Sequence, residues 1–206
     1  MKFNSKLISD AVQEFSKLPG IGEKTALRLV LHLLKQDKEK VKHFSDAIFT
    51  MRSEIKFCKH CHNIADVEVC EICTNAFRDK NTICVVESIR ELIAIESTGI
   101  YKGLYHVLGG LISPVDGVGP DQLNISSLFY RIENDPIQEI IMALSPTIEG
   151  DTTIFYLSKK MADRPLKITS IARGVSFGGE LEFTDELTLA RSIATRMPYE
   201  NVLIKN

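Results

Sequence analysis

The apolar positions of the first 56 residues recur at helical spacing. In residues 5–17 and again in residues 23–36 they fall on one side of a helix, and Ser5 is suited to cap the first. A third series alternates steps of three and four residues, which is typical of an amphipathic helix: Val41, Phe44, Ile48, Met51 and Ile55. We predict three helices, with a glycine turn at residues 18–22 joining the first two.

After residue 80, short β-branched runs alternate with helical segments. We predict strands at residues 82–86, 104–108, 139–144 and 166–171. We predict helices at residues 89–97, 121–133, 149–160 and 185–196. Residues 153–157 fit either a strand or a helix, and we favour the helix because the alternation then stays regular. The pattern predicts a mostly parallel α/β sheet, with ligand sites beyond the carboxyl ends of its strands and a long loop at 109–120.

Composition and charge narrow the possible functions. A hydrophobic content of 44% with 25% charged residues is typical of a globular protein and excludes a largely disordered one. The sequence shows neither a membrane-spanning run nor a secretory leader, so we expect a cytoplasmic protein. Residues 1–56 contain 11 Lys and Arg against 7 Asp and Glu, whereas the remainder contains 14 against 20. Only the N-terminal part is suited to a polyanion such as DNA.

The turn between the first two helices has the features of a helix-hairpin-helix. Gly20 and Gly22 would bring backbone N–H groups close to a phosphate at the start of the second helix. Lys24, and Arg28 one turn later, would face the same groove. Such contacts hold the DNA backbone without reading bases, so binding would be sequence-independent and would weaken with salt. The alternative is a turn that serves only packing or dimerisation.

Four of the five cysteines form two Cys-x-x-Cys pairs separated by eight residues. This spacing predicts one structural Zn²⁺ per chain in a closed tetrahedral shell, which leaves no position for a substrate. The adjacent His60 and His62 are interpreted as surface residues, and Cys84 as a buried residue of a strand. The predicted zinc ligands are Cys58, Cys61, Cys70 and Cys73.

Three acidic residues follow predicted strands. Glu87 comes directly after the strand at 82–86, and Glu149 and Asp151 come shortly after the strand at 139–144. Together they could bind Mg²⁺, which prefers carboxylate oxygens. The alternative is that Glu149 and Asp151 only stabilise the start of a helix through its dipole.

The order of these motifs resembles the RecR family of bacterial recombination mediators. The resemblance covers nearly the whole chain and continues through residues 105–114, 145–151, 171–174 and 178–182. It implies an α+β multidomain fold: a helix-hairpin-helix module at 1–56, a four-cysteine zinc finger at 57–79, a Toprim domain at 80–172, and a C-terminal Walker-B-like oligomerisation segment at 173–206.

The same resemblance implies a function. Members of that family are non-enzymatic DNA-binding proteins that, with RecO and often RecF, promote loading of RecA onto gapped DNA coated with single-strand-binding protein. They form dimer or tetramer rings able to encircle DNA, so we expect a DNA clamp in the cytoplasm at the nucleoid.

A residue-by-residue comparison with catalytic Toprim enzymes argues against catalysis. Those enzymes have a strand-end glutamate, which Glu87 matches, and a later D-x-D-x-E-G-E motif. Here Ser145 and Thr147 replace the two aspartates of D-x-D, and only Glu149 and Asp151 remain acidic. We therefore expect no catalytic residue and no tight Mg²⁺ binding, and we predict that the remaining carboxylates contact RecO. A Toprim-type metal-dependent nuclease or primase-like enzyme is the alternative.

Overall fold

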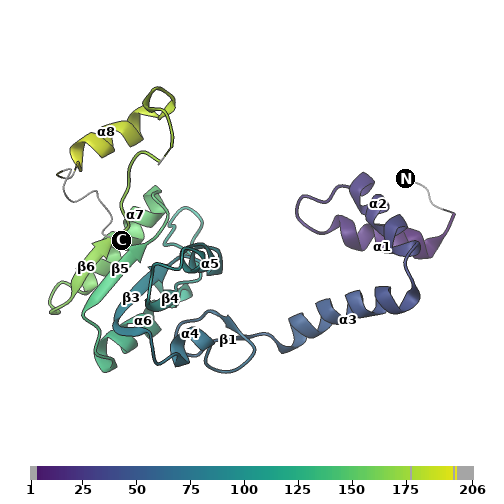
Figure 1. Ribbon diagram of the computed structural model, residues 1–206, viewed down its shortest axis with the longest axis horizontal. Coiled ribbons are helices and arrows are strands. Elements are labelled where there is room, and N and C mark those ends of the chain that lie inside the picture. The colour runs from purple at the N-terminus through teal and green to yellow at the C-terminus, as the bar shows by residue number, and fades with distance from the viewer. Residues whose placement is uncertain (1–3, 177, 197, 199–206) are drawn as a thin grey trace. The chain divides into compact units, whose positions relative to one another are not determined.

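The computed structural model describes residues 4–176, 178–196 and 198 (Figure 1). The chain divides into two compact units, Met1–Ile55 and Lys56–Asn206. No helix in the described part of the chain is long and apolar enough to cross a membrane.

The first unit contains the three predicted helices, α1 (Lys6–Ser16), α2 (Glu23–Leu34) and α3 (Lys38–Glu54). Ser5 caps α1 as predicted, since its side chain accepts a hydrogen bond from the backbone N–H of Ile8 at 3.5 Å. Helices α1 and α2 pack around a small core of Val12, Ala26 and Val30.

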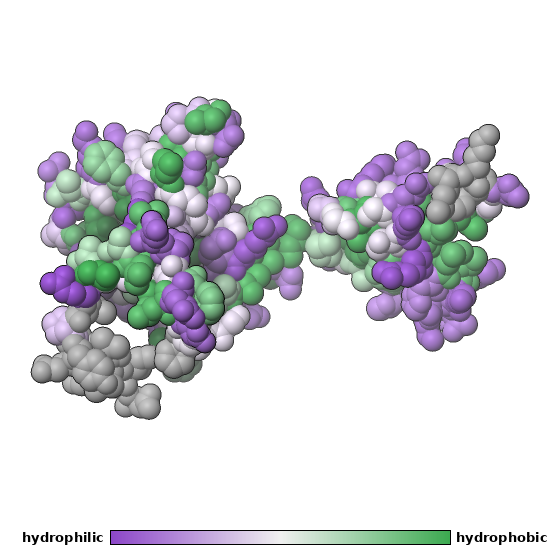
Figure 2. Space-filling view, turned by 90° about the horizontal axis from the view of Figure 1, so that it is seen from above, coloured by the Kyte–Doolittle hydropathy of each residue, from purple (hydrophilic) through white to green (hydrophobic). Residues whose placement is uncertain are grey.

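Helix α3 differs from the other two helices because none of its residues is buried. Four of its large apolar side chains are exposed, up to 73% for Phe49, and the space-filling view shows apolar residues at the surface along this stretch (Figure 2). The others are Phe44, Ile48 and Met51. An uncovered apolar row of this kind is a feature of helices that associate with another surface.

The second unit begins with a small cysteine-rich subdomain. It consists of the antiparallel pair β1 (Lys56–Phe57) and β2 (Ile64–Ala65), followed by the short helix α4 (Glu71–Thr74).

In the described part of the second unit, a parallel four-stranded sheet forms the centre. Its strands are β3 (Asp79–Val86), β4 (Gly103–Val107), β5 (Glu139–Ala143) and β6 (Lys167–Ser170). Their order is β4-β3-β5-β6, and every neighbouring pair runs parallel. Val86 lies opposite both Val107 and Ala143, so these three strands end at the same edge of the sheet.

Helices cover both faces of this sheet. Successive side chains of β3 point to opposite faces and therefore join two different cores. Ile83 and Val85 join a core formed with helices α6 (Ile125–Asn134) and α7 (Ile148–Lys160). Cys84, which is buried as predicted, and Val86 join a smaller core against α5 (Ile89–Ser97). This is the predicted α+β organisation.

The remaining elements are short. A 3-10 turn, η1 (Pro120–Gln122), precedes α6, and a second one, η2 (Leu181–Phe183), precedes α8 (Glu186–Ala194). Asp185 caps α8 by accepting a hydrogen bond from the Thr188 N–H at 2.9 Å.

Two element predictions are decided by the structure. Residues 153–157 belong to α7, so the favoured helix is confirmed. The prediction of a helix over 121–133 is wrong at its start, because α6 begins only at Ile125. Pro120 begins the separate turn η1, and the Asn124 N–H then donates to the Leu108 carbonyl at 2.9 Å, which holds the chain against the end of β4.

Candidate functional site

The hairpin between α1 and α2 presents an open backbone surface. Gly20 has φ +77°, a left-handed conformation that favours glycine, and Gly22 is the N-cap of α2 with φ −80°. A Cβ atom at either position would meet nothing within 4 Å. Gly22 has no side chain to cap α2, so the positive end of the helix dipole faces this open surface.

The basic residues predicted for this motif lie together. Lys24 and Arg28 are exposed, and both line a groove of about 440 Å³ along α2. His32 and Lys35 line the same groove, although the sequence analysis did not identify them. Their positions four and seven residues after Arg28 follow the helical spacing, which could have revealed them.

The four paired cysteines form a metal centre. Their Sγ atoms all lie within 4.8 Å of one another, and a tetrahedral zinc with Zn–S bonds of about 2.3 Å places its sulfurs about 3.8 Å apart. The Sγ atoms of Cys61 and Cys70 are 3.5 Å apart, and the Cys70 N–H donates to the Cys58 sulfur at 3.3 Å. The donor set fits one zinc ion.

The zinc centre is fixed directly to the sheet. The Val107 N–H donates to the Cys61 carbonyl at 2.8 Å. The ring of His62 packs edge-on against His106 with 5.2 Å between centroids, and its Nε2 lies 2.7 Å from the Ser127 hydroxyl. The interpretation of His62 as a surface residue is therefore wrong, while His60 is exposed as predicted.

His106 is a buried neutral residue in this junction. Burial, the larger effect, and the nearby Arg131 guanidinium lower the pKa of His106 to about 3. Its Nε2 lies 2.7 Å from the Asn124 carbonyl.

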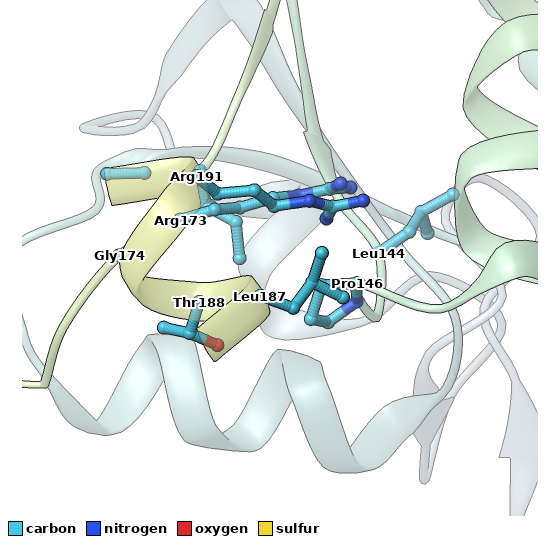
Figure 3. A pocket seen from close by; sticks show the side chains of 9 residues that line it. Leu144, Pro146, Arg173, Gly174, Leu187, Thr188 and Arg191 are labelled. Atoms are coloured by element: carbon cyan, nitrogen blue, oxygen red, sulfur yellow. The ribbon is translucent and has the colours of Figure 1, made fainter. Parts of the chain in front are cut away.

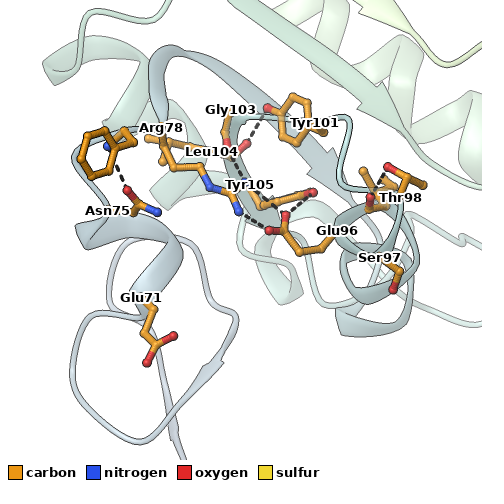
Figure 4. Close-up of polar contacts among 12 residues, drawn as sticks. Glu71, Asn75, Arg78, Glu96, Ser97, Thr98, Tyr101, Gly103, Leu104 and Tyr105 are labelled. Atoms are coloured by element: carbon orange, nitrogen blue, oxygen red, sulfur yellow. Dashed lines mark hydrogen bonds and ion pairs between the residues drawn. The ribbon is translucent and has the colours of Figure 1, made fainter.

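A second set of polar contacts joins the segment after α4 to the sheet (Figure 4). The Arg78 guanidinium pairs with the Glu96 carboxylate of α5 and also donates to the Gly103 carbonyl at 3.2 Å. The Tyr105 hydroxyl donates to the same carboxylate at 2.9 Å. The hydrogen bond from Arg78, the largest effect, lowers the pKa of Glu96. These contacts position the start of β3.

Two of the three acidic residues at the carboxyl ends of the strands, Glu87 and Asp151, have side-chain partners within the chain. Glu87 accepts a hydrogen bond from the Ser145 hydroxyl at 3.0 Å. Thr147 caps α7 by accepting from the Gly150 N–H at 3.1 Å. The two residues that stand in place of the D-x-D aspartates are thus used for hydrogen bonding and for capping. Glu149 is half-buried in the first turn of α7.

Asp151 is paired with two arginines of the C-terminal part of the chain. The Arg173 guanidinium lies 2.6 Å from Asp151 Oδ1, and that of Arg191 lies 3.6 Å from Oδ2. Both side chains extend into a pocket of about 290 Å³ beside Leu144 and Pro146 (Figure 3). In the part of the chain that the structure describes, only the four cysteines form a group of three or more residues able to hold a metal ion. Glu87, Glu149 and Asp151 do not form one.

Four family models match successive segments of the chain. Three are described as "RecR, helix-hairpin-helix" at residues 8–51, "Toprim domain" at 81–172 and "RecR, C-terminal" at 174–197, and the fourth is the four-cysteine zinc finger domain of RecR at 55–75. The Recombination protein RecR of Flavobacterium johnsoniae is 59% identical to this chain over all 206 residues and over its own full length. The chain belongs to the RecR family.

Other RecR relatives match over similar lengths. The Recombination protein RecR of Cytophaga hutchinsonii is 57% identical over 201 residues, which cover 97% of this chain and 98% of the relative. That of Porphyromonas gingivalis is 50% identical over 200 residues, which cover 97% of each chain. The resemblance predicted from the motifs is confirmed, and membership of the RecR family implies a role in DNA recombination and repair. The family's zinc finger model agrees with the clustered cysteines, so the predicted zinc is confirmed as the metal that this site fits.

Proposed function

We propose that this RecR-family chain is a non-enzymatic recombination mediator that binds DNA through its hairpin. With RecO, and with RecF where the cell has it, it promotes loading of RecA onto gapped DNA coated with single-strand-binding protein. The observation that carries the proposal is the start of α2, where the N-cap Gly22 leaves the helix N-terminus without a side-chain cap and two exposed cations, Lys24 and Arg28, line a groove along the helix.

The DNA contact is made by Gly20, Gly22, Lys24 and Arg28. The glycines allow a phosphate to approach the backbone N–H groups at the start of α2, and the two cations neutralise neighbouring phosphates. None of these groups reads a base edge, so binding is sequence-independent. Duplex, gapped and junction DNA are all ligands of this kind of site.

The chemistry of the strand ends supports a non-enzymatic role. Two-metal and one-metal nucleases need several carboxylate oxygens free to hold Mg²⁺. Here Ser145 and Thr147 supply no carboxylate, and Asp151 is paired with Arg173 and Arg191. This arrangement supports a Toprim domain that serves as a docking surface and disfavours the nuclease or primase alternative.

The acidic residues of that surface are proposed contacts for RecO. All three are half-buried, but Glu87 accepts a hydrogen bond from Ser145 and Asp151 already pairs with two internal cations. A basic partner would have to compete with Arg173 for Asp151. Glu149 is therefore the residue whose charge reversal should weaken RecO binding most.

Self-association into a dimer or tetramer ring completes the clamp. The exposed apolar row of α3 supports it, since Phe44, Ile48, Phe49 and Met51 would be covered by another copy. A ring of this kind would hold DNA in the cytoplasm, at the nucleoid.

The test is DNA binding across a salt series, with and without RecO. The Lys24→Ala/Arg28→Ala variant should bind gapped duplex at least tenfold more weakly, and its log–log salt slope should be shallower by about two. Lys38→Ala/Lys42→Ala on α3 is the matched control, because it removes the same charge from the same unit and lies outside the groove. Equal losses in both variants, or no loss in either, would show that the hairpin does not hold phosphate.

A further inference from the structure

A pocket of about 410 Å³ lies where the zinc finger meets the sheet. It lies at the amino ends of β3 and β4, whereas the Toprim carboxylates lie at the carboxyl ends. Neither the hairpin nor the acidic strand ends accounts for it. The polar residues that line it include His60, Lys80, Arg131 and Asp135.

The Nε atom of Arg131 is a hydrogen-bond donor without an acceptor in the described part of the protein. The Arg131 side chain is only 5% exposed, and its Nη1 donates to the Tyr105 carbonyl at 2.7 Å. Its Nε is buried without a hydrogen bond, since the acidic oxygen paired with it, Asp135 Oδ2, is 3.7 Å away. A buried donor without an acceptor is costly, so this guanidinium indicates an oxygen ligand.

A second cation lines this pocket together with Arg131. Lys80 at the start of β3 and His60 of the zinc finger are exposed and line the same pocket, and Asp135 is its one acidic lining residue among those described. The sequence after residue 56 has more acidic than basic residues, so a polyanion can approach the second unit only where cations converge. Guanidinium and ammonium groups together are typical ligands of phosphate.

We propose that this pocket binds a phosphate group of DNA, with Arg131 and Lys80 as its ligands. The inference rests on the proposed DNA binding and adds a second contact, in the second unit, to that of the hairpin. Asp135 opposes the phosphate and tunes its affinity. The competing role for these cations is to offset the negative charge of the zinc-bound thiolates, since Cys73 lines the same pocket.

The test uses two exposed residues with opposite expected effects, because replacing Arg131 would also remove its bond to β4. Lys80→Ala in the full zinc-loaded chain should weaken binding to gapped duplex by about three- to tenfold and reduce the salt slope by about one. Asp135→Asn should strengthen binding. The matched controls are Lys159→Ala on α7 and Asp163→Asn, exposed residues outside the pocket that change the net charge equally.

Each result decides between the possibilities. Equal effects of Lys80→Ala and Lys159→Ala would overturn the site and indicate only a general charge effect. Zinc loss from Lys80→Ala with unchanged DNA affinity would assign the cations to the metal centre instead. If Lys24→Ala/Arg28→Ala weakens binding while Lys80→Ala does not, this inference fails and the proposed function stands; if neither does, both fail.

A comparison of DNA ends shows whether the pocket binds a backbone phosphate or a terminal phosphate. Each variant is compared on gapped duplex carrying a 5′-phosphate or a 5′-hydroxyl at the gap. If the pocket takes a backbone phosphate, Lys80→Ala weakens both substrates equally. If it takes a terminal phosphate, only the 5′-phosphorylated substrate is affected.

Discussion

The second unit contains two sets of residues of metal-binding types, the paired cysteines and the strand-end carboxylates, and among the described residues only the cysteines lie close enough together to hold a metal ion. At the zinc finger, four sulfurs lie within 4.8 Å of one another. At the carboxyl ends of β3 and β5, Glu87 accepts a hydrogen bond from a serine and Asp151 pairs with two arginines. Ligand-type residues therefore indicate a metal site only where the protein leaves their lone pairs available.

The largest effect is expected at the zinc finger. Cys58→Ser should abolish stoichiometric zinc and unfold the finger, because a structural zinc contributes apparent binding free energies of about 10–16 kcal/mol. Metal analysis and thermal unfolding measure this. Cys84→Ala is the control, since Cys84 is buried in β3 outside the cluster and its loss should leave one zinc per chain.

The contact between Arg78 and Glu96 should have the next largest effect. Glu96→Gln leaves the largely buried Arg78 without its counter-ion, so we expect the free energy of unfolding to fall by about 1–3 kcal/mol in chemical denaturation.

The same variant predicts a pH dependence. Because the pKa of Glu96 is lowered in the folded state, its stabilisation is present above the ordinary value of 4.5 and is lost as pH falls through the lowered pKa. The wild type should thus lose more stability than Glu96→Gln between neutral pH and pH below 4.5. An identical loss in both proteins would mean that this carboxylate is not stabilised by folding.

Restoring the two aspartates of the D-x-D motif should allow the strand-end carboxylates to bind a metal ion. Ser145→Asp places a carboxylate beside Glu87, and Thr147→Asp keeps a residue able to cap α7. With millimolar Mg²⁺ the double variant should gain about 1 kcal/mol of stability, whereas the wild type should gain none. Thermal unfolding with and without Mg²⁺ measures the gain. Adding Glu87→Gln is the control, and a gain that survives it would place the metal elsewhere.

The smallest effect is expected from Arg191. Its guanidinium is 3.6 Å from Asp151 and largely exposed, so Arg191→Ala should cost below about 1 kcal/mol in chemical denaturation. Arg173→Ala should cost more, because its contact is shorter and less exposed. The reverse order would show that Arg191 holds the carboxylate.

The sequence predicted the features that depend on local spacing. Helical periodicity indicated α1 to α3, and the Cys-x-x-Cys pairs indicated the zinc ligands. Prediction failed where distant residues decide the outcome. His62 is packed by Ser127 and His106, and Asp151 is paired with Arg173 and Arg191, and none of these contacts follows from a local pattern. Likewise, only the structure shows that Arg131 Nε has no hydrogen-bond acceptor, because this depends on residues distant in the sequence.

The central claim is that the four cysteines bind a metal ion and the strand-end carboxylates do not. Its most direct test is the metal content of the purified chain after equilibration with Zn²⁺ and with excess Mn²⁺, which substitutes for Mg²⁺. Elemental analysis should find one zinc per chain and no stoichiometric manganese. One manganese per chain, lost in Glu87→Gln, would show that the Toprim carboxylates bind metal and would contradict the account.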